Sequence, residues 1–190
     1  MVPIPAGKLM VYSKYDGKEV FIDNFFMDSF EVSQESYEKI INFNPSFFVH
    51  RKRPVEKVNW FEAVEYCLKI GKRLPSEWEW AARSGNTSKF YRGKEDPKLY
   101  SWFNKNSERK TQPIGQKKPN SYGLFDMAGN VWEWTNSHRE STQGKVLRGG
   151  SWRNSMNAMQ SFKWITSLPI HRFHYVGFRC ATSKLPTRNN

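Results

Sequence analysis

The feature that most restricts what this chain can fold into is a helix whose beginning and end are both signalled by the sequence. Asn59 and Glu62 have the spacing of a capping box, in which each side chain accepts a hydrogen bond from the other residue's backbone N–H. Gly71 is placed to end the helix in a left-handed conformation. The apolar residues between them share one stripe: Ala63, Val64, Cys67 and Leu68. Cys67 is therefore predicted to face the core.

Two further helices are predicted on either side of this one. Ser33 is placed to cap a helix over SQESYEKIINF, and Pro45 is placed to stop it. Ser76 and Glu79 also have capping-box spacing and open the short helix SEWEWAARSG, which Gly85 ends. Helices are thus expected in the first half of the chain.

Strand patterns lie near the N-terminus and in the last third of the chain. Residues 19–30, EVFIDNFFMDSF, indicate one or two strands, and others are predicted over 131–135, 146–152 and 176–182. Between them, residues 86–122 predict a long loop that isolated aromatic residues anchor: Tyr91, Tyr100, Trp102 and Phe103. The predicted class is α+β, with two main helices, a small antiparallel sheet and much irregular chain.

The length of 190 residues suits one domain with a sizeable core and is too short for two. We therefore interpret residues 1–190 as a single domain. Hydrophobic residues make up only 38% of the chain, but eight Trp are among them. Because each Trp buries a large area, a core can be built from few side chains.

The charge of the chain is strongly basic and unevenly distributed. The formal net charge is +12, and from Trp134 onward nine basic residues accompany one acidic residue. Such a field can attract nucleic acid, an anionic surface or an acidic protein. Solubility alone also explains it, because no zinc-finger spacing, RNA-binding aromatic signature or long Lys/Arg block is present.

No stretch of the chain has the pattern of a membrane span or a signal peptide. An apolar run of about 18 residues, the minimum for a spanning helix, does not occur. The start, MVPIPAGKLMVYS, lacks a basic region followed by an apolar region. The compartment is left open between the cytoplasm and association with a virion or cell surface by another route.

Eight short pieces cover nearly the whole chain in a fixed order: MVPIPAG, FFMDSFEVSQESYEKI, NPSFF, RPVEKVNWFEAVEYC, GKRLPSEWEWAAR, NSYGLFDMAGNVWEW, LRGGSW and GFRCA. In this order they resemble the formylglycine-generating-enzyme, or sulfatase-modifying-factor, domain family. That family is a branch of the C-type lectin fold. The resemblance implies this fold for the present chain.

The resemblance also implies where an active site would lie. The family's oxidases carry two cysteines, spaced Cys-x4-Cys, just after the GGS-aromatic segment, and these thiolates bind copper and activate oxygen. The corresponding positions here are Asn154 and Met159, which supply no thiolate. Another branch binds iron through three His, but the close pair His171 and His174 has no third ligand in view. We therefore predict that the protein is not an enzyme and requires no cofactor.

A structural calcium ion is a further implication of the resemblance. The family binds calcium through the segment that matches DMAGNVWE. The ligands here would be the carboxylates of Asp126 and Glu133 and the backbone carbonyls of Gly129 and Val131. A Gly-Asn turn that enters a strand, with Glu133 hydrogen-bonded to backbone, explains the same residues. The sequence leaves both interpretations open.

The two cysteines also match positions that matter in the family. Cys67 and Cys180 correspond to a pair that bridges the helix to the last strand in some relatives. A buried, reduced pair is the alternative. The sequence does not choose between them.

The passage between GGSW and GFR resembles the variable proteins of diversity-generating retroelements, which share this fold. In those systems a reverse transcriptase copies a template with errors at adenines, and Asn codons become many other residues. Their gap between the two motifs is 24 residues, as it is here in Arg153–Val176. Residues 165–168 and 173–175 are all reachable from an Asn codon through its two adenines. Residues that are not reachable are template residues or products of ordinary evolution: Met156, Met159, Gln160, Lys163 and Trp164.

We expect residues 153–175 to form the binding site of a non-enzymatic, receptor-type variable protein, because aromatic, His and Arg side chains give rigid contact area. The expected partner is a protein or another macromolecular surface. The alternatives are a metal-dependent oxidoreductase or modifying enzyme of the formylglycine-generating family, and a basic nucleic-acid binder. The oligomeric state is left open. The predicted contact residues are Arg153, Asn154, Asn157, Lys163, Trp164, Ile165, Thr166, Leu168, Ile170, His171, Phe173, His174 and Tyr175.

Overall fold

The structure is a computed structural model that describes residues 1–12, 17–76, 78–85, 90, 93, 95–138 and 143–184. Its helices are α1 (Gln34–Ile41), α2 (Trp60–Lys69) and α3 (Trp78–Arg83), with 3-10 turns η1 (Pro97–Leu99) and η2 (Met156–Met159). Its strands are β1 (Val2–Ile4), β2 (Gly7–Tyr12), β3 (Gly17–Ile22), β4 (Phe25–Met27), β5 (Trp132–His138), β6 (Lys145–Arg148), β7 (Trp164–Ser167), β8 (Val176–Gly177) and β9 (Ala181–Thr182). The predicted α+β class with much irregular chain is confirmed.

The capping signals of α2 act as predicted. Asn59 Oδ1 accepts the N–H of Glu62, and Glu62 Oε2 accepts the N–H of Asn59, both at 2.9 Å. Gly71 lies just beyond the helix with a φ of 71°. Cys67 is fully buried. The cap and the terminator were therefore correctly identified from the sequence. The stripe was only partly right, because Leu68 is 63% exposed and Tyr66, which the stripe left out, is buried.

The other two helices differ from their predictions in detail. Ser33 Oγ accepts the N–H of Ser36 at the start of α1, as predicted. This helix ends at Ile41 because Asn42 takes a left-handed conformation, with a φ of 61°, before Pro45 is reached. The capping box predicted for Ser76 and Glu79 falls on a side chain outside the described part of the structure.

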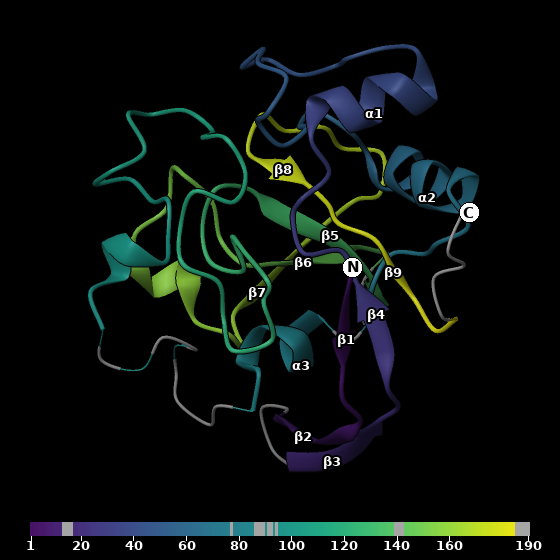
Figure 1. The fold of residues 1–190 in the computed structure, drawn as a ribbon, viewed down its shortest axis with the longest axis vertical. Coiled ribbons are helices and arrows are strands. Elements are labelled where there is room, and N and C mark those ends of the chain that lie inside the picture. Colours follow the sequence, from purple (N-terminus) through teal and green to yellow (C-terminus); the bar gives the residue numbers. More distant parts are fainter. Residues whose placement is uncertain are drawn as a thin grey trace.

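A four-stranded sheet in the order β7-β6-β5-β8 occupies the centre of the molecule (Figure 1). β6 pairs antiparallel with β5 and β7, whereas the short β8 pairs parallel with β5. The sheet is therefore mixed, and not purely antiparallel as predicted. β1, β4 and β9 form a second, antiparallel sheet, and β2 pairs with β3 as a hairpin.

Two predicted strands are shorter than expected because glycines and bends interrupt them. β6 ends at Arg148, since Gly149 and Gly150 have φ values of 94° and 79°, which extended strands do not contain. A side chain at position 150 would meet Met159 Sδ at 2.8 Å, so this close approach also requires glycine. The predicted strand 176–182 is divided into β8 and β9, which belong to different sheets.

β7 lies inside the passage 153–175, where the sequence shows no strand period. It is an edge strand, with alternating exposed and half-buried residues. The alternation is hidden in the sequence because its outward side chains are Trp164 and Thr166, and Trp is as apolar as the inward Ile165. Pairing with β6, and not a pattern in the local sequence, therefore makes these residues a strand.

Hydrophobic clusters cover both faces of the central sheet. In Figure 1, α1 and α2 lie on one side of the sheet and α3 lies on the other. The cluster beneath α1 and α2 includes Tyr37, Val58, Tyr66, Trp134, Leu147 and Phe178. The cluster beneath α3 includes Phe25, Trp78, Phe103, Leu124, Met127 and Met159. Because both faces are covered, a ligand surface must come from the connections between strands and from the sheet edges.

The described part of the predicted loop 86–122 is anchored largely as predicted. Phe103 is buried, and Tyr100 packs against the cluster beneath α3. Trp102 is half-buried, and Lys117 Nζ lies 3.7 Å from the centroid of its ring. Tyr91, the fourth predicted anchor, lies outside the described residues.

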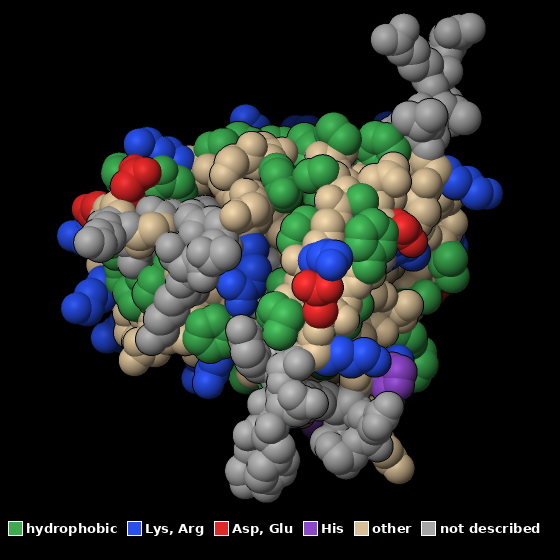
Figure 2. Space-filling view, turned by 90° about the horizontal axis from the view of Figure 1, so that it is seen from below, with side chains coloured by type: hydrophobic (Ala, Val, Ile, Leu, Met, Phe, Trp, Pro, Cys, Tyr) green, Lys and Arg blue, Asp and Glu red, His purple; other side chains and the backbone are tan. Residues whose placement is uncertain are grey.

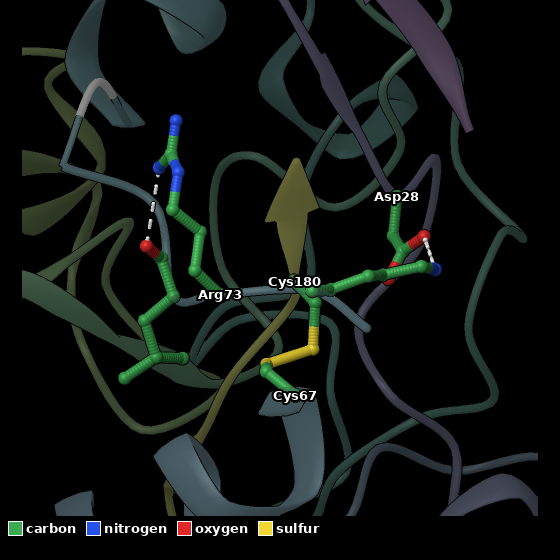
Figure 3. The surroundings of a disulfide bond; sticks show 6 residues. Asp28, Cys67, Arg73 and Cys180 are labelled. Atoms are coloured by element: carbon green, nitrogen blue, oxygen red, sulfur yellow. Dashed lines mark hydrogen bonds and ion pairs between the residues drawn. A yellow bond between two sulfur atoms is a disulfide. The ribbon is translucent and has the colours of Figure 1, made fainter. Parts of the chain in front are cut away.

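A disulfide bond joins α2 to the end of the chain. Figure 3 shows Cys67 bonded to Cys180, which is 113 positions later, and both residues are fully buried. Beside it, Lys72 Nζ donates to Asp28 Oδ1 at 2.5 Å, and the N–H of Asp28 donates to the carbonyl of Cys180 at 2.9 Å. Of the two states that the sequence left open, the bonded pair is the one formed.

Candidate functional site

The passage 153–175 is a surface connection held at both ends by the central sheet. It follows β6, passes through η2, pairs as β7 at one edge of the sheet and rejoins the sheet as β8 at the other edge. The N–H of Trp152 donates to the carbonyl of Asn130 at 2.8 Å, and the carbonyl of Tyr175 accepts the N–H of Trp132 at 2.9 Å. Fixed ends of this kind allow the side chains between them to change without loss of the scaffold.

The register of β7 sends adjacent predicted contact residues to opposite faces of the sheet. Ile165 lies opposite Leu147, and Trp164 lies opposite Arg148. Residues directly opposite each other share a face. Leu147 belongs to the cluster beneath α1 and α2, and Ile165 packs against that cluster. Ile165 is therefore partly a core residue, whereas Trp164 lies on the other face.

The middle of the passage presents aliphatic side chains to solvent. Leu168 is 41% exposed and Ile170 is 63% exposed. The backbone between these two residues is held by a hydrogen bond, because the carbonyl of Pro169 accepts the N–H of Trp60 at 2.9 Å. The predicted contact residues that are exposed are Arg153, Asn157, Lys163, Trp164, Thr166, Leu168, Ile170 and His171.

The last part of the passage forms a group of half-buried rings. Phe173 and Tyr175 stack with centroids 5.1 Å apart, and both pack against the cluster beneath α1 and α2. His174 lies 5.4 Å from Tyr175, and the Arg153 guanidinium lies 4.7 Å above the ring of Tyr175. His171 meets Phe173 edge-on at 5.7 Å. The structure thus brings these five predicted residues together.

Asn154, predicted as a contact residue, serves the scaffold. Its Oδ1 accepts hydrogen bonds from the N–H and Oγ of Ser151 and from Trp132 Nε1, at 2.7 to 3.1 Å. Its carbonyl accepts the N–H of Asn104 at 3.1 Å. Met159 is buried at 2% exposure. The two positions that match the oxidase cysteines are therefore occupied by side chains committed to hydrogen bonding and packing.

Two groups outside the passage contact it, and the sequence prediction missed both. The ring of Phe47 lies 5.8 Å from that of His174, and the ring of Phe48 lies 6.0 Å from the same histidine ring. Glu62 Oε1 also accepts a hydrogen bond from Arg172 at 2.6 Å. The signal was present in the adjacent Phe residues of NPSFF, but nothing in the sequence shows which distant segment they meet.

A group of charged side chains is buried in the interior of the molecule. Arg179 forms a bidentate ion pair with Glu133, with distances of 2.8 Å, and Trp78 Nε1 donates to the same carboxylate at 2.7 Å. Glu31 accepts hydrogen bonds from Asn130 and from the N–H of Val131. Burial, with the nearby carboxylates of Asp126 and Glu133, raises the pKa of Glu31 well above its ordinary value.

The residues implied as calcium ligands lie beside this charge group. Both oxygens of Glu133 are engaged by Arg179, whereas Asp126 Oδ1 is buried without a hydrogen-bond donor among the described residues. Burial raises the pKa of the Asp126 carboxyl to about 6. Asp126 therefore fits a hard cation and Glu133 is already paired. Calcium remains a proposal, which a calcium-dependent rise in melting temperature would support.

Among the described residues, no group of three or more His, Cys, Asp and Glu side chains is arranged to hold a metal ion. No helix in that part of the chain is long and apolar enough to cross a membrane. Figure 2, which views the molecule from the side of β2 and β3, shows Lys and Arg dispersed between hydrophobic and neutral side chains.

The fold agrees with that of known proteins. Residues 1–184 match the sulfatase-modifying factor enzyme 1-like domain family. The chaperone protein LppX of Paenibacillus barcinonensis is 29% identical over 78% of this chain and 76% of its own length. The formylglycine-generating enzyme of Mus musculus is 27% identical over 98% of this chain and 76% of its own length. The solved structure of Treponema denticola variable protein 1 has a TM-score of 0.86 and 27% identity, and covers 97% of this chain and 95% of the Treponema chain.

The molecule is therefore a domain with the C-type lectin fold of the formylglycine-generating type, with a surface passage between its last strands. It belongs to the sulfatase-modifying factor enzyme 1-like domain family. The family and the likeness to a variable protein, both predicted from the sequence, are confirmed.

Proposed function

We propose that this protein binds a macromolecular ligand through residues 153–175 and catalyses no reaction on it. The observation that carries the proposal is that most side chains of this passage are exposed or half-buried while its ends are hydrogen-bonded into the central sheet. The passage can then present different side chains to a ligand without altering the core. The likeness to Treponema denticola variable protein 1 supports the same assignment.

The side chains at the oxidase positions support the absence of catalysis. Asn154 is committed to three hydrogen bonds and Met159 to the core, so neither position offers a soft, oxygen-activating metal ligand. Formylglycine formation in a cysteine-containing peptide by the copper-treated protein would contradict this part of the proposal. We further propose that the passage is diversified by a retroelement, and a reverse transcriptase gene beside an adenine-differing copy of the 3′ end would support this.

A randomised library tests whether the passage is a display surface. Codons for Lys163, Thr166, Leu168 and Ile170 are randomised together, and we expect most variants to keep the wild-type melting temperature within a few degrees. The control library randomises two core positions, Val146 and Leu147, and should mostly fail to fold because buried substitutions cost several times more than exposed ones. Equal loss of folding in the two libraries would overturn the proposed display role.

A further inference from the structure

An aromatic platform continues the binding passage onto the connection between α1 and α2. We use this name for Phe47, Phe48, Trp152, His174 and Tyr175. The ring of Phe47 lies 5.0 Å from Phe48 and 5.8 Å from His174, and Phe48 meets Trp152 edge-on at 5.5 Å. Phe47 is 66% exposed. Two of the five rings therefore come from a segment more than 100 positions before the passage.

The segment that carries Phe47 is held rigidly from below. Glu56 Oε1 accepts the N–H groups of Phe47 and Phe48 at 2.6 and 2.7 Å. Gln34 Nε2 donates to the carbonyl of Phe48 at 2.9 Å, and Gln34 Oε1 accepts the N–H of His50 at 2.9 Å. Both anchoring side chains are buried. An exposed aromatic ring on a fixed backbone loses little entropy when a ligand covers it.

Positive charge flanks the platform. Arg153 lies over the ring of Tyr175, and the N–H of Lys57 donates to the carbonyl of Phe173 at 3.0 Å. Neither Arg153 nor Lys57 forms an ion pair with an acidic side chain among the described residues. Burial, followed by the charges of Arg153 and Lys57, lowers the pKa of His174.

Acidic side chains near the platform offer no compensating charge at the surface. Glu62 is paired with Arg172, and Glu35 is paired with Arg51. Glu56 is fully buried beneath Phe47 and Phe48. The outer face of the platform is therefore aromatic and cationic, which is complementary to a ligand that combines carboxylates with aromatic side chains.

We propose that residues 44–50 form a constant half of the binding surface, and that the aromatic platform binds an acidic polypeptide segment carrying aromatic side chains. This inference rests on the proposed binding function of residues 153–175. It deepens that function, because the passage would supply changeable contacts while Phe47 and Phe48 supply a contact common to all variants.

Ring geometry favours a polypeptide over single-stranded nucleic acid. Bases stack on open ring faces and their phosphates need a row of cations. Tyr175 is stacked with Phe173 and covered by Arg153, and the rings of Phe48 and Trp152 are packed edge to face. Edge contacts with aromatic side chains and a bidentate Arg–carboxylate pair suit this arrangement.

Fluorescence anisotropy with synthetic polymers tests the proposal. The probes are a labelled random copolymer of glutamate and tyrosine, polyglutamate of equal length, and oligothymidylate. We expect the wild-type protein to bind the copolymer about tenfold more tightly than polyglutamate, and Phe47→Ala to remove most of that difference. The matched control is Phe21→Ala, since Phe21 is 62% exposed on β3, at the opposite end of the molecule from α1 and β8 in Figure 1.

A second pair of variants tests the charges. Lys57→Gln and Arg153→Gln should each weaken binding of both acidic polymers and reduce its dependence on salt. Equal affinity for copolymer and polyglutamate, tighter binding of oligothymidylate, or wild-type binding by Phe47→Ala would each overturn the inference. If Phe47→Ala binds as wild type but Leu168→Ala with Ile170→Ala does not, the constant half is wrong and the function of the passage stands.

Discussion

Glu56 has no exposed surface, and its role is to hold two neighbouring backbone N–H groups in place. Its Oε1 accepts both bonds, whereas its Oε2 is buried without a hydrogen-bond donor among the described residues. Burial raises the pKa of Glu56, partly offset by the N–H groups of Phe48 and Phe47. One carboxylate thus fixes the exposed ring of Phe47 and the half-buried ring of Phe48, although its own charge is buried and incompletely paired.

Replacement of Glu56 tests its effect on stability and its effect on the backbone of Phe47 and Phe48. Glu56→Ala should lower the free energy of unfolding by about 1–3 kcal/mol, because two amides lose their acceptor. It should also speed hydrogen exchange at Phe47 and Phe48. Glu56→Gln retains an acceptor oxygen and should restore slow exchange. Slow exchange at both amides in Glu56→Ala would show that other contacts hold the segment.

The raised pKa of Glu56 also predicts a pH dependence. Because its folded pKa lies above its unfolded value, its contribution to stability is greatest below the unfolded pKa and is lost as the pH rises through the folded value. The free energy of unfolding of the wild type, relative to Glu56→Gln, should therefore fall as the pH rises above the unfolded pKa of a Glu carboxyl, about 4. Denaturant titrations at several pH values measure this difference.

At the scale of the elements, the passage 153–175 has an outer part and a part that packs on the core. Leu168 and Ile170 extend from the end of the edge strand β7 into solvent. Phe173 and Tyr175 pack against the cluster beneath α1 and α2, just before β8. The outer part can change freely, whereas changes in the second part affect folding as well as binding.

Single alanine substitutions distinguish the two parts. Leu168→Ala and Ile170→Ala should change the free energy of unfolding by less than about 0.5 kcal/mol, and Phe173→Ala and Tyr175→Ala should lower it by about 1–3 kcal/mol. Urea titrations followed by Trp fluorescence measure all four. If Ile170→Ala lowered the free energy of unfolding as much as Phe173→Ala, both residues would belong to one packed layer, and the division of the passage into an outer and a packed part would be contradicted.

At the scale of the whole molecule, covalent and ionic links tie the end of the chain to its beginning and middle. The Cys67–Cys180 bond closes a loop of 113 positions between α2 and the residue before β9. Arg179, its neighbour, also donates to the carbonyl groups of Ser29 and Phe125 while it pairs with Glu133. The passage 153–175 lies within the loop that the disulfide closes.

Removal of the disulfide should lower stability without changing the fold. In the double variant Cys67→Ala with Cys180→Ala, the free energy of unfolding should fall by about 3–5 kcal/mol, because a bond across a loop of about 100 residues strongly restricts the unfolded chain. Chemical denaturation of the double variant and of wild type reduced while unfolded should give similar losses. Undiminished stability of the reduced protein would mean that packing alone holds α2 against the last strands.

Much of the fold, and part of the site, could be predicted because their signals are local. The cap of α2 requires Asn59 and Glu62, three residues apart, so the sequence alone indicates it. The limits of the passage, Arg153 and Val176, were likewise recognisable from the GGSW and GFR motifs beside them. Asn154 was predicted as a contact residue because it lies in the segment 153–175. Only its hydrogen bonds to Trp132 and Ser151 show that it belongs to the scaffold.

What the sequence by itself determined is the family, the capped helices, the loss of the oxidase cysteines and the limits of the exposed passage. Only the tertiary structure decided that Cys67 and Cys180 bond, that β7 turns Ile165 inward and Trp164 outward, and that Phe47 meets His174. The physical reason is the range of the interactions. Caps and turns depend on residues a few positions apart, whereas strand register and ring contacts depend on packing between segments far apart in the chain.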